Sequence, residues 1–434
     1  MLIQRATPLD GAAVDVRVGA QIEEVGDKLT PRRGEDVFDA GGGTVLPGLH
    51  DHHVHLYSAA AAEDSVRVGP PQVRDRDDLA HTLTTAQVGS DGWIRAVGYD
   101  DSCAGPLDRT VLDTISPPVP VRVQHRSGVL WILNSAALSA VGLADHPDGR
   151  LRSADPEWSD ALGRREINLA PLSSRLARYG VTGVTDATPD LGVGDIVTLT
   201  ELHRRGKLLQ HVHCLAPGKR ILHDDSLDLD ALAGWIAERH RNDGTVAIHC
   251  VTAAQLVVAI AALRQAGARP GDRIEHAAVV PPDSLGELAE LGVIVVTQPN
   301  FVAERGDHYL AEVPVAEHDQ LWRVASLINA GVAVALSTDM PFGGDDPWAA
   351  MRAAVHRTTP SGAVLNPSEC ITARTALTMF LGRAGEPAQP RAVEPGQAAD
   401  LCILSVPPNT ALAELDAEMI AATIVSGVVV HCRR

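Results

Sequence analysis

Short apolar runs alternate with Ala/Leu-rich segments through the central part of the chain. The apolar runs have the length expected of buried strands and lie at 181–188, 245–251, 273–279, 292–299 and 331–339. Helical segments lie between them, for example at 253–267 and 282–292. This alternation predicts parallel strands joined by crossover helices, and hence an α/β barrel or a doubly wound sheet.

The two ends of the chain have a different pattern. Residues 1–44, 393–408 and 419–434 contain β-branched runs separated by Gly-rich turns. Such runs are typical of short antiparallel strands. We therefore expect a small sheet domain that is built from both chain ends.

Composition limits the classes of partner. The chain has 434 residues, enough for more than one compact unit, and its net charge of −18 argues against nucleic acid and anionic membranes. The chain start has no signal-peptide pattern, and no apolar run is long enough to span a bilayer. The six cysteines are scattered, as in a reducing compartment. We expect a cytoplasmic protein that acts on a small molecule. We also expect a homodimer, because dimers are the most frequent oligomers of soluble enzymes.

The segment "VLPGLHDHHVHL" at 45–56 contains four histidines and an aspartate. In an extended strand, Asp51, His53 and His55 share one face, whereas His50 and His52 share the other. Two imidazoles at positions i and i+2 converge on one point, as a metal site requires. The alternative is a polar strand end with solvated histidines.

Other predicted strands also end in residues that can bind a metal. These residues are His249, His276 and Asp339. In a (β/α)8 barrel the carboxyl ends of the strands converge on one mouth, so these side chains would join those of the first strand. Such a set of nitrogen and oxygen ligands suits Zn²⁺, and less well Mn²⁺ or Fe²⁺.

These motifs together resemble the amidohydrolase superfamily, in particular its YtcJ-like (amidohydrolase type 3) branch. "PGLHDHHVHL" is similar to the family pattern P-G-x-x-D-x-H-x-H, and "VAIHCVTAAQL", "DRIEHAAVV" and "LSTDMPFGGDDPW" follow in the family order. The resemblance implies a (β/α)8 TIM-type barrel at 47–384 with an insertion at about 60–170. It also implies a small composite β-sandwich from 1–46 and 385–434.

The resemblance further implies a site with one or two divalent metal ions, zinc foremost. It selects as ligands His53, His55, His249, His276 and Asp339. Asp51 would support them, whereas His50 and His52 would not bind the metal. Lys219 stands close to where the family carries a bridging carboxylated lysine, with a surface lysine as the alternative. Glu166 is an additional candidate ligand.

Two further segments contain residues that could belong to the site. His211 and His213 form a second H-x-H, but no Pro-Gly-x-x-Asp precedes them, so we interpret them as structural. Residues 297–310 are expected to form the loop after the seventh strand. There Arg305 and Tyr309 are candidate substrate contacts, with an ordinary surface loop as the alternative.

The implied function is hydrolysis of a non-peptide C–N bond, in an amide, a cyclic amide or a formamide, by a metal-activated water. Asp339 would act as general base and then as general acid. One alternative is an aminohydrolase (deaminase) acting on a ring amidine. Glu275 disfavours it, because strand alternation is expected to point Glu275 away from His276. A non-catalytic barrel scaffold is disfavoured by the full ligand set, and an isomerase or lyase on the same barrel stays open.

Overall fold

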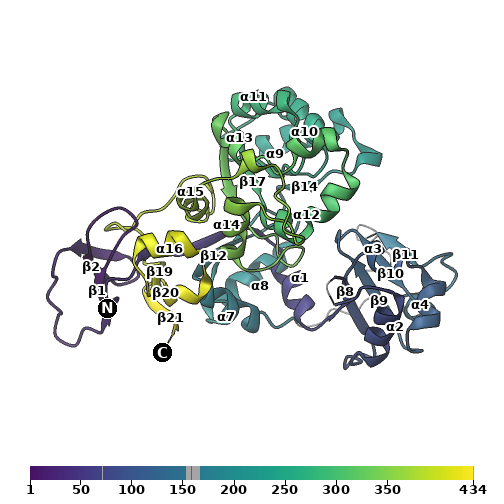
Figure 1. Ribbon diagram of the computed structural model, residues 1–434, viewed down its shortest axis with the longest axis horizontal. Coiled ribbons are helices and arrows are strands. Elements are labelled where there is room, and N and C mark those ends of the chain that lie inside the picture. The colour runs from purple at the N-terminus through teal and green to yellow at the C-terminus, as the bar shows by residue number, and fades with distance from the viewer. Residues whose placement is uncertain (71, 153–157, 159–166, 434) are drawn as a thin grey trace. The chain divides into compact units, whose positions relative to one another are not determined.

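The computed structural model describes residues 1–70, 72–152, 158 and 167–433 (Figure 1). The chain divides into two compact units. One consists of Met1–His55 and Leu169–Arg434, and the other of Leu56–Asn168. The candidate ligands predicted above lie in the first unit, except Glu166, which is outside the described residues.

Eight strands of the first unit run parallel, in two sheets. The sheet orders are β13-β12-β6 and β14-β15-β16-β17-β18. The strands are β6 (Leu49–Val54), β12 (Val181–Asp186), β13 (His211–Cys214), β14 (Lys219–Ile221), β15 (Ala247–Cys250), β16 (Arg273–His276), β17 (Ile294–Thr297) and β18 (Ala333–Leu336). The parallel α/β arrangement predicted from the apolar runs is therefore confirmed.

The first unit also contains helices, most of which follow one of these strands. They are α7 (Ala170–Arg178), α8 (Val193–Arg204), α9 (Leu229–Arg241), α10 (Ala253–Ala266), α11 (Pro282–Leu291), α12 (Asn300–Glu312), α13 (Val324–Asn329), α14 (Pro347–His356), α15 (Ala373–Thr378) and α16 (Pro408–Glu414). Short 3-10 helices lie at Asp224–Ser226, Val315–Gln320, Pro367–Glu369 and Ala417–Met419. No described helix has the length and apolar character that crossing a bilayer would require.

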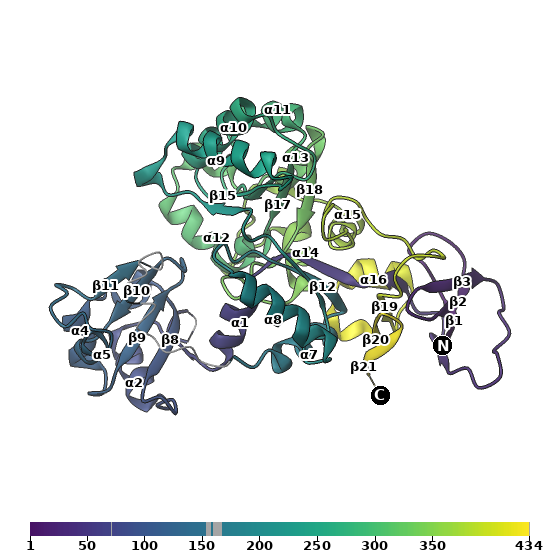
Figure 2. The ribbon, with the colours of Figure 1, turned by 180° about the vertical axis from the view of Figure 1, so that it is seen from behind.

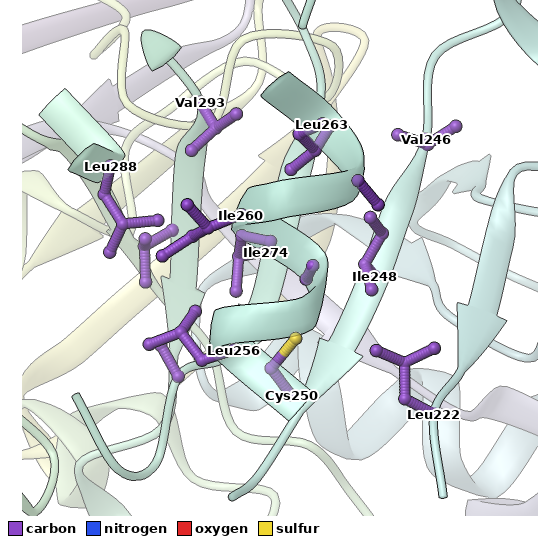
Figure 3. Packing of buried hydrophobic residues seen from close by; sticks show 14 of the residues in the cluster. Leu222, Val246, Ile248, Cys250, Leu256, Ile260, Leu263, Ile274, Leu288 and Val293 are labelled. Atoms are coloured by element: carbon purple, nitrogen blue, oxygen red, sulfur yellow. The ribbon is translucent and has the colours of Figure 1, made fainter. Parts of the chain in front are cut away.

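Helix α10 begins and packs as its sequence predicts. The Thr252 hydroxyl accepts a hydrogen bond from the Gln255 amide and caps the first turn. Leu256 and Ile260 then face Ile248 of β15 and Ile274 of β16 (Figure 3). Because these side chains are almost fully buried, they form the core that holds the helix layer against the sheet.

The two parallel sheets are linked where β6 and β18 end. The Asp339 amide donates to the His53 carbonyl at 3.0 Å, and the His55 amide donates to the Met340 carbonyl at 2.9 Å. At the other side, only residues 215–218 connect β13 to β14, too few for a crossover helix. The residues after β18 therefore lie directly beside the end of β6.

Both chain ends contribute to a second pair of sheets, of order β3-β2-β1-β4 and β21-β20-β19-β5. The strands are β1 (Leu2–Ala6), β2 (Val14–Val18), β3 (Ile22–Gly26), β4 (Val37–Asp39), β5 (Val45–Pro47), β19 (Leu401–Leu404), β20 (Ile420–Val425) and β21 (Val428–Cys432). Buried residues such as Ile3, Val16, Ile403 and Ile424 form one hydrophobic cluster. Figures 1 and 2 agree in drawing the purple and yellow segments side by side.

The second unit has its own mixed sheet of order β11-β10-β9-β8-β7 and its own hydrophobic core. Its elements are α1 (Leu56–Glu63), β7 (Val66–Arg67), α2 (Arg76–Thr85), β8 (Ile94–Tyr99), α3 (Asp101–Ala104), α4 (Arg109–Ile115), β9 (Val121–His125), β10 (Leu130–Leu133), α5 (Ser135–Ala140) and β11 (Arg150–Arg152).

The expectation of a loop at 297–310 is wrong, because most of this segment is helix α12. Gly306 is a packing residue inside this helix and not a turn residue. A Cβ at position 306 would lie 2.4 Å from the Thr359 Cγ2 atom, so only glycine permits this close approach. The side chains of Phe301 and Val302, in the first turn of the helix, are buried and stabilise it through packing.

Candidate active site

Strand β6 and the residue that follows it carry two separate groups of histidines. The pairing of β6 with β12 shifts register twice, and the histidines still divide into the two groups that strand alternation predicts. His50 and His52 stack on each other with ring centroids 4.6 Å apart, and His50 Nε2 lies 2.9 Å from the Thr185 hydroxyl. His53 and His55 form the other pair, at 5.4 Å.

Asp339 lies beside the second pair. It follows β18 in a left-handed conformation with φ of 57°, which turns its carboxylate toward β6. Its Oδ1 atom is 3.6 Å from His53 Nε2 and 3.4 Å from His55 Nε2. The ligand atoms of these three buried residues all lie within 4.8 Å of one another. Such a set can hold a divalent metal ion.

His276 and His249 extend this cluster. The His276 ring lies 4.8 Å from that of His53 and 4.5 Å from that of His249. His276 has φ of 71°, so β16 ends there and the side chain does not follow the alternation of the strand. The structure thus brings together the five strand-end residues that were predicted separately along the sequence.

Lys219 is buried at the start of β14, and the alternative of a surface lysine is wrong. Its Nζ atom lies 3.0 Å from His53 Nε2. Burial lowers the pKa of Lys219 to about 8, against the opposing effect of Glu275 and Asp339. A neutral amine is therefore accessible near neutral pH.

Burial also favours the neutral form of His53, His249 and His276. It lowers the pKa of His53 and His249 well below the ordinary value and lowers the pKa of His276. Burial acts to raise the pKa of Asp339, but the imidazoles of His55 and His276 outweigh it, so this pKa is lowered. Neutral imidazoles and an ionised carboxylate are the protonation states that bind metal.

The Nδ1 atoms of three imidazoles contact polar partners. His53 Nδ1 contacts the Glu275 carboxylate, His276 Nδ1 lies 2.7 Å from Gln298 Oε1, and His55 Nδ1 lies 3.1 Å from the Thr188 hydroxyl. The Gln298 amide nitrogen donates to Ser337, which fixes its oxygen toward His276. The Nε2 atoms of His53 and His276 are left as acceptors.

The position of Glu275 corrects the sequence interpretation. The expectation that Glu275 points away from the site is wrong, because Glu275 pairs with His249 in register and touches His53. The alternation rule fails because His276, not Glu275, leaves the strand conformation. Thr188 and Gln298 were also missed, although each lies at the carboxyl end of a predicted strand, 181–188 and 292–299, which is the signal that could have found them.

Asp51 holds the segment that precedes Asp339. Its carboxylate accepts hydrogen bonds from the Thr338 hydroxyl and, at 3.0 Å, from the Thr338 amide. Asp51 therefore fixes the backbone that carries Asp339, in keeping with the supporting role expected for it.

Arg305 and Tyr309 lie on α12. Arg305 donates to the Phe342 carbonyl and places its guanidinium 4.4 Å from the Phe301 ring centroid. The Phe342 ring lies 5.2 Å from that of His55, so Arg305 holds a neighbour of the cluster. Tyr309 packs beside Trp322, at 6.3 Å. Substrate contact by either residue stays a prediction.

His211 of the second H-x-H motif makes its contacts outside this cluster. His211 Nε2 lies 3.2 Å from an Asp400 carboxylate oxygen, and Asp400 also accepts from the Ser426 amide. This contact ties β13 to the C-terminal strands, a structural role of the kind that the missing Pro-Gly-x-x-Asp indicated.

Buried histidines and an aspartate at the carboxyl ends of parallel strands define a class of α/β hydrolase that works with a divalent metal. The Amidohydrolase family matches residues 36–431, and the chain belongs to this family. The resemblance seen in the motifs is confirmed, as is the assignment to hydrolases of non-peptide C–N bonds.

The chain is similar to several known proteins over nearly its whole length. It is 27% identical to an N-substituted formamide deformylase of Arthrobacter pascens, covering 91% of this chain and 89% of the relative. It is 25% identical to the putative amidohydrolase YtcJ of Bacillus subtilis, covering 90% and 89%. The structure of an uncharacterized metal-dependent hydrolase from Pyrococcus horikoshii has the same fold, with a TM-score of 0.74, 21% identity and coverage of 94% and 97%.

Proposed function

We propose that the protein hydrolyses non-peptide C–N bonds with a metal-activated water, and that the cluster around His53 is its active site. The observation that carries this proposal is the buried triad of His53, His55 and Asp339. Asp339 Oδ1 makes no hydrogen bond of good geometry among the described residues, and a divalent cation held between this oxygen and the two imidazoles would compensate for its burial. The donor set therefore fits a divalent metal ion.

The residues divide into candidate ligands for one or two ions. His53, His55 and Asp339 would hold the first ion, and His249 and His276 the second. Nitrogen and carboxylate donors favour zinc. Lys219 would bridge the two as a carbamate, formed when its neutral Nζ adds CO₂ and releases a proton. Burial and the contact between Nζ and His53 Nε2 support this assignment.

The protein residues account for the proton transfers. A bound divalent ion lowers the pKa of water and polarises a carbonyl oxygen. Asp339 accepts the proton of the attacking water and then delivers it to the leaving nitrogen. Its low pKa keeps the carboxylate ionised before attack. The Phe342 ring lies edge-on to His55 and covers that imidazole from one side.

The substrate class that we propose first is the N-substituted formamides. The similarity to the Arthrobacter deformylase, which covers nine-tenths of both chains, supports this choice over other amides and cyclic amides. Deamination of a ring amidine is the alternative. Both Glu275 oxygens accept from Arg273, and one also contacts His53, so Glu275 is poorly placed as the acid that this alternative needs.

We also propose that the eight parallel strands close into one (β/α)8 barrel at 47–384, with an insertion at about 60–170. Residues 1–46 and 385–434 would form the β-sandwich. The backbone hydrogen bonds between the Asp339 region and β6 support closure on one side. The contact between Lys219 of β14 and His53 of β6 spans the interior.

The remaining proposals concern the cellular setting. We propose a cytoplasmic homodimer that binds a small-molecule substrate and neither nucleic acid nor membrane. The net charge of −18 supports the exclusion of polyanionic partners.

The test is amine release from N-butylformamide, with and without chelation. We expect turnover that disappears after chelation and returns with Zn²⁺. A matched panel of linear amides, cyclic amides and ring amidines identifies the bond that is cleaved. Turnover that survives complete metal removal would contradict the mechanism, and ammonia release from a ring amidine alone would establish the alternative.

A further inference from the structure

Strand β16 places an arginine and a glutamate together beside the cluster around His53. Arg273 and Glu275 are two residues apart on one face of the strand and are both buried. The Arg273 Nε atom donates to Glu275 Oε1 at 2.7 Å, and Nη2 donates to Oε2 at 3.1 Å. This two-point pairing fixes the plane of the Glu275 carboxylate.

The pair contacts β6 at two neighbouring residues. Glu275 Oε2 contacts His53 Nδ1 through its carboxylate. Arg273 Nη2 also donates to the His52 carbonyl at 2.8 Å, so it holds the backbone immediately before His53. The imidazole and the peptide that carries it are therefore held by one ion pair from a different strand.

A carboxylate can only accept hydrogen bonds, so the contact with Glu275 places the His53 proton on Nδ1. The lone pair then lies on Nε2, the atom that faces Lys219 Nζ and Asp339 Oδ1. Without Glu275, the neutral imidazole is free to take the other tautomer, in which Nε2 carries the proton and cannot bind a metal.

We propose that the Arg273–Glu275 pair positions His53, by setting its tautomer and ring orientation for metal binding. This inference rests on the proposed function. Glu275 acts through His53 and not on the substrate, because Arg273 and His53 together occupy both its oxygens. A partner of this kind on the second nitrogen of a metal-binding histidine strengthens metal affinity by about 10–100-fold.

A second buried carboxylate–histidine pair in the same unit provides a matched control. Asp272 is fully buried, and its carboxylate contacts His240 Nε2 at 3.0–3.1 Å. It also accepts from the Val246 and Arg269 amides. Asp272 directly precedes Arg273 in the sequence. Asp272→Asn therefore removes a buried negative charge beside a histidine, as Glu275→Gln does, but this histidine, His240, lies outside the cluster.

The experiment measures zinc affinity by competition with a chelator, together with the melting temperature of the metal-free chain. We expect Glu275→Gln to weaken zinc binding about 10–100-fold, Glu275→Asp to weaken it less, and Asp272→Asn to leave it unchanged while lowering the melting temperature. If Glu275→Gln does not fold, Arg273→Lys, which keeps the charge and loses the two-point contact, is measured in its place.

The outcomes separate this inference from the proposed function. Zinc affinity in Glu275→Gln that equals the wild-type value would overturn the positioning role while leaving the metal site intact. Equal loss of affinity in Glu275→Gln and Asp272→Asn would also overturn it, because a general loss of stability would then explain both. A wild-type chain that binds no zinc would overturn the proposed function itself.

Discussion

At the scale of single residues, the sequence predicted the members of the cluster but not how they are held. His53, His55, His249, His276 and Asp339 each follow or end a recognisable apolar strand, and parallel strands bring such ends together. The partners of their Nδ1 atoms depend on backbone angles that a sequence pattern does not contain. The φ of 71° at His276, which takes its side chain off the alternation of β16 so that it joins the cluster that Glu275 also contacts, is one such angle.

The proposed role of Asp339 in proton transfer can be tested by mutation. Asp339→Asn removes the group that accepts and returns the proton, so kcat for N-butylformamide should fall by about 10²–10⁴. Asp307→Asn is the control. Asp307 lies on α12 and accepts hydrogen bonds from the Thr359 hydroxyl and the Ser361 amide, so its substitution should leave kcat unchanged. A kcat of Asp339→Asn close to that of the wild type would contradict the proton-transfer role.

A second prediction concerns pH and the pair of His211 and Asp400. The hydrogen bond to Asp400 raises the pKa of His211 in the folded chain. The stabilisation is fully present below the unfolded pKa of about 6.5 and is lost as pH rises through the folded value. The melting temperature of the wild type should therefore exceed that of His211→Gln by more at pH 5.5 than at pH 8.5.

Thermal melts at the two pH values test this prediction. Asp400→Asn should abolish the difference between the two pH values, because the histidine then has no charged partner. A difference in melting temperature between the wild type and His211→Gln that is larger at pH 8.5 than at pH 5.5 would contradict a raised pKa of His211.

At the scale of elements, strands and helices with a strong apolar pattern were predictable and those that depend on tertiary contacts were not. The core strands and the helices α10 and α11 lie within the predicted ranges. Helix α12 was missed, because the segment was expected to be a loop from its place after the seventh strand, which does not determine its conformation. The helix forms because Gly306 permits close packing on Thr359 and because Phe301 is buried.

The packing of α10 on the sheet should contribute measurably to the free energy of unfolding. Leu256→Ala should lower the free energy of unfolding by about 2–5 kcal/mol, because the side chain is fully buried and a cavity would remain. Val257→Ala is the matched control on the same helix, since the Val257 side chain is exposed and should change the free energy by less than about 0.5 kcal/mol. Urea denaturation measures both, and similar values for the two variants would contradict the described orientation of α10.

At the scale of the whole molecule, the sequence predicted a central α/β region and sheets built from both chain ends. Each terminal sheet contributes strands to one hydrophobic cluster that contains residues nearly the whole chain length apart. The same long-range closure places Asp339 beside His53. The candidate metal site therefore depends on long-range contacts of the folded first unit, and no short segment contains it.

The most direct test of the account is the metal content per chain of protein purified without chelators. We compare the wild type, His53→Ala/His55→Ala, and His211→Ala/His213→Ala, which removes the same H-x-H motif elsewhere. The account predicts one or two zinc-class ions in the wild type and in the His211/His213 variant, with loss in the His53/His55 variant. A wild-type chain that stays metal-free after reconstitution, or a His53/His55 variant that keeps its full metal content, would contradict the account.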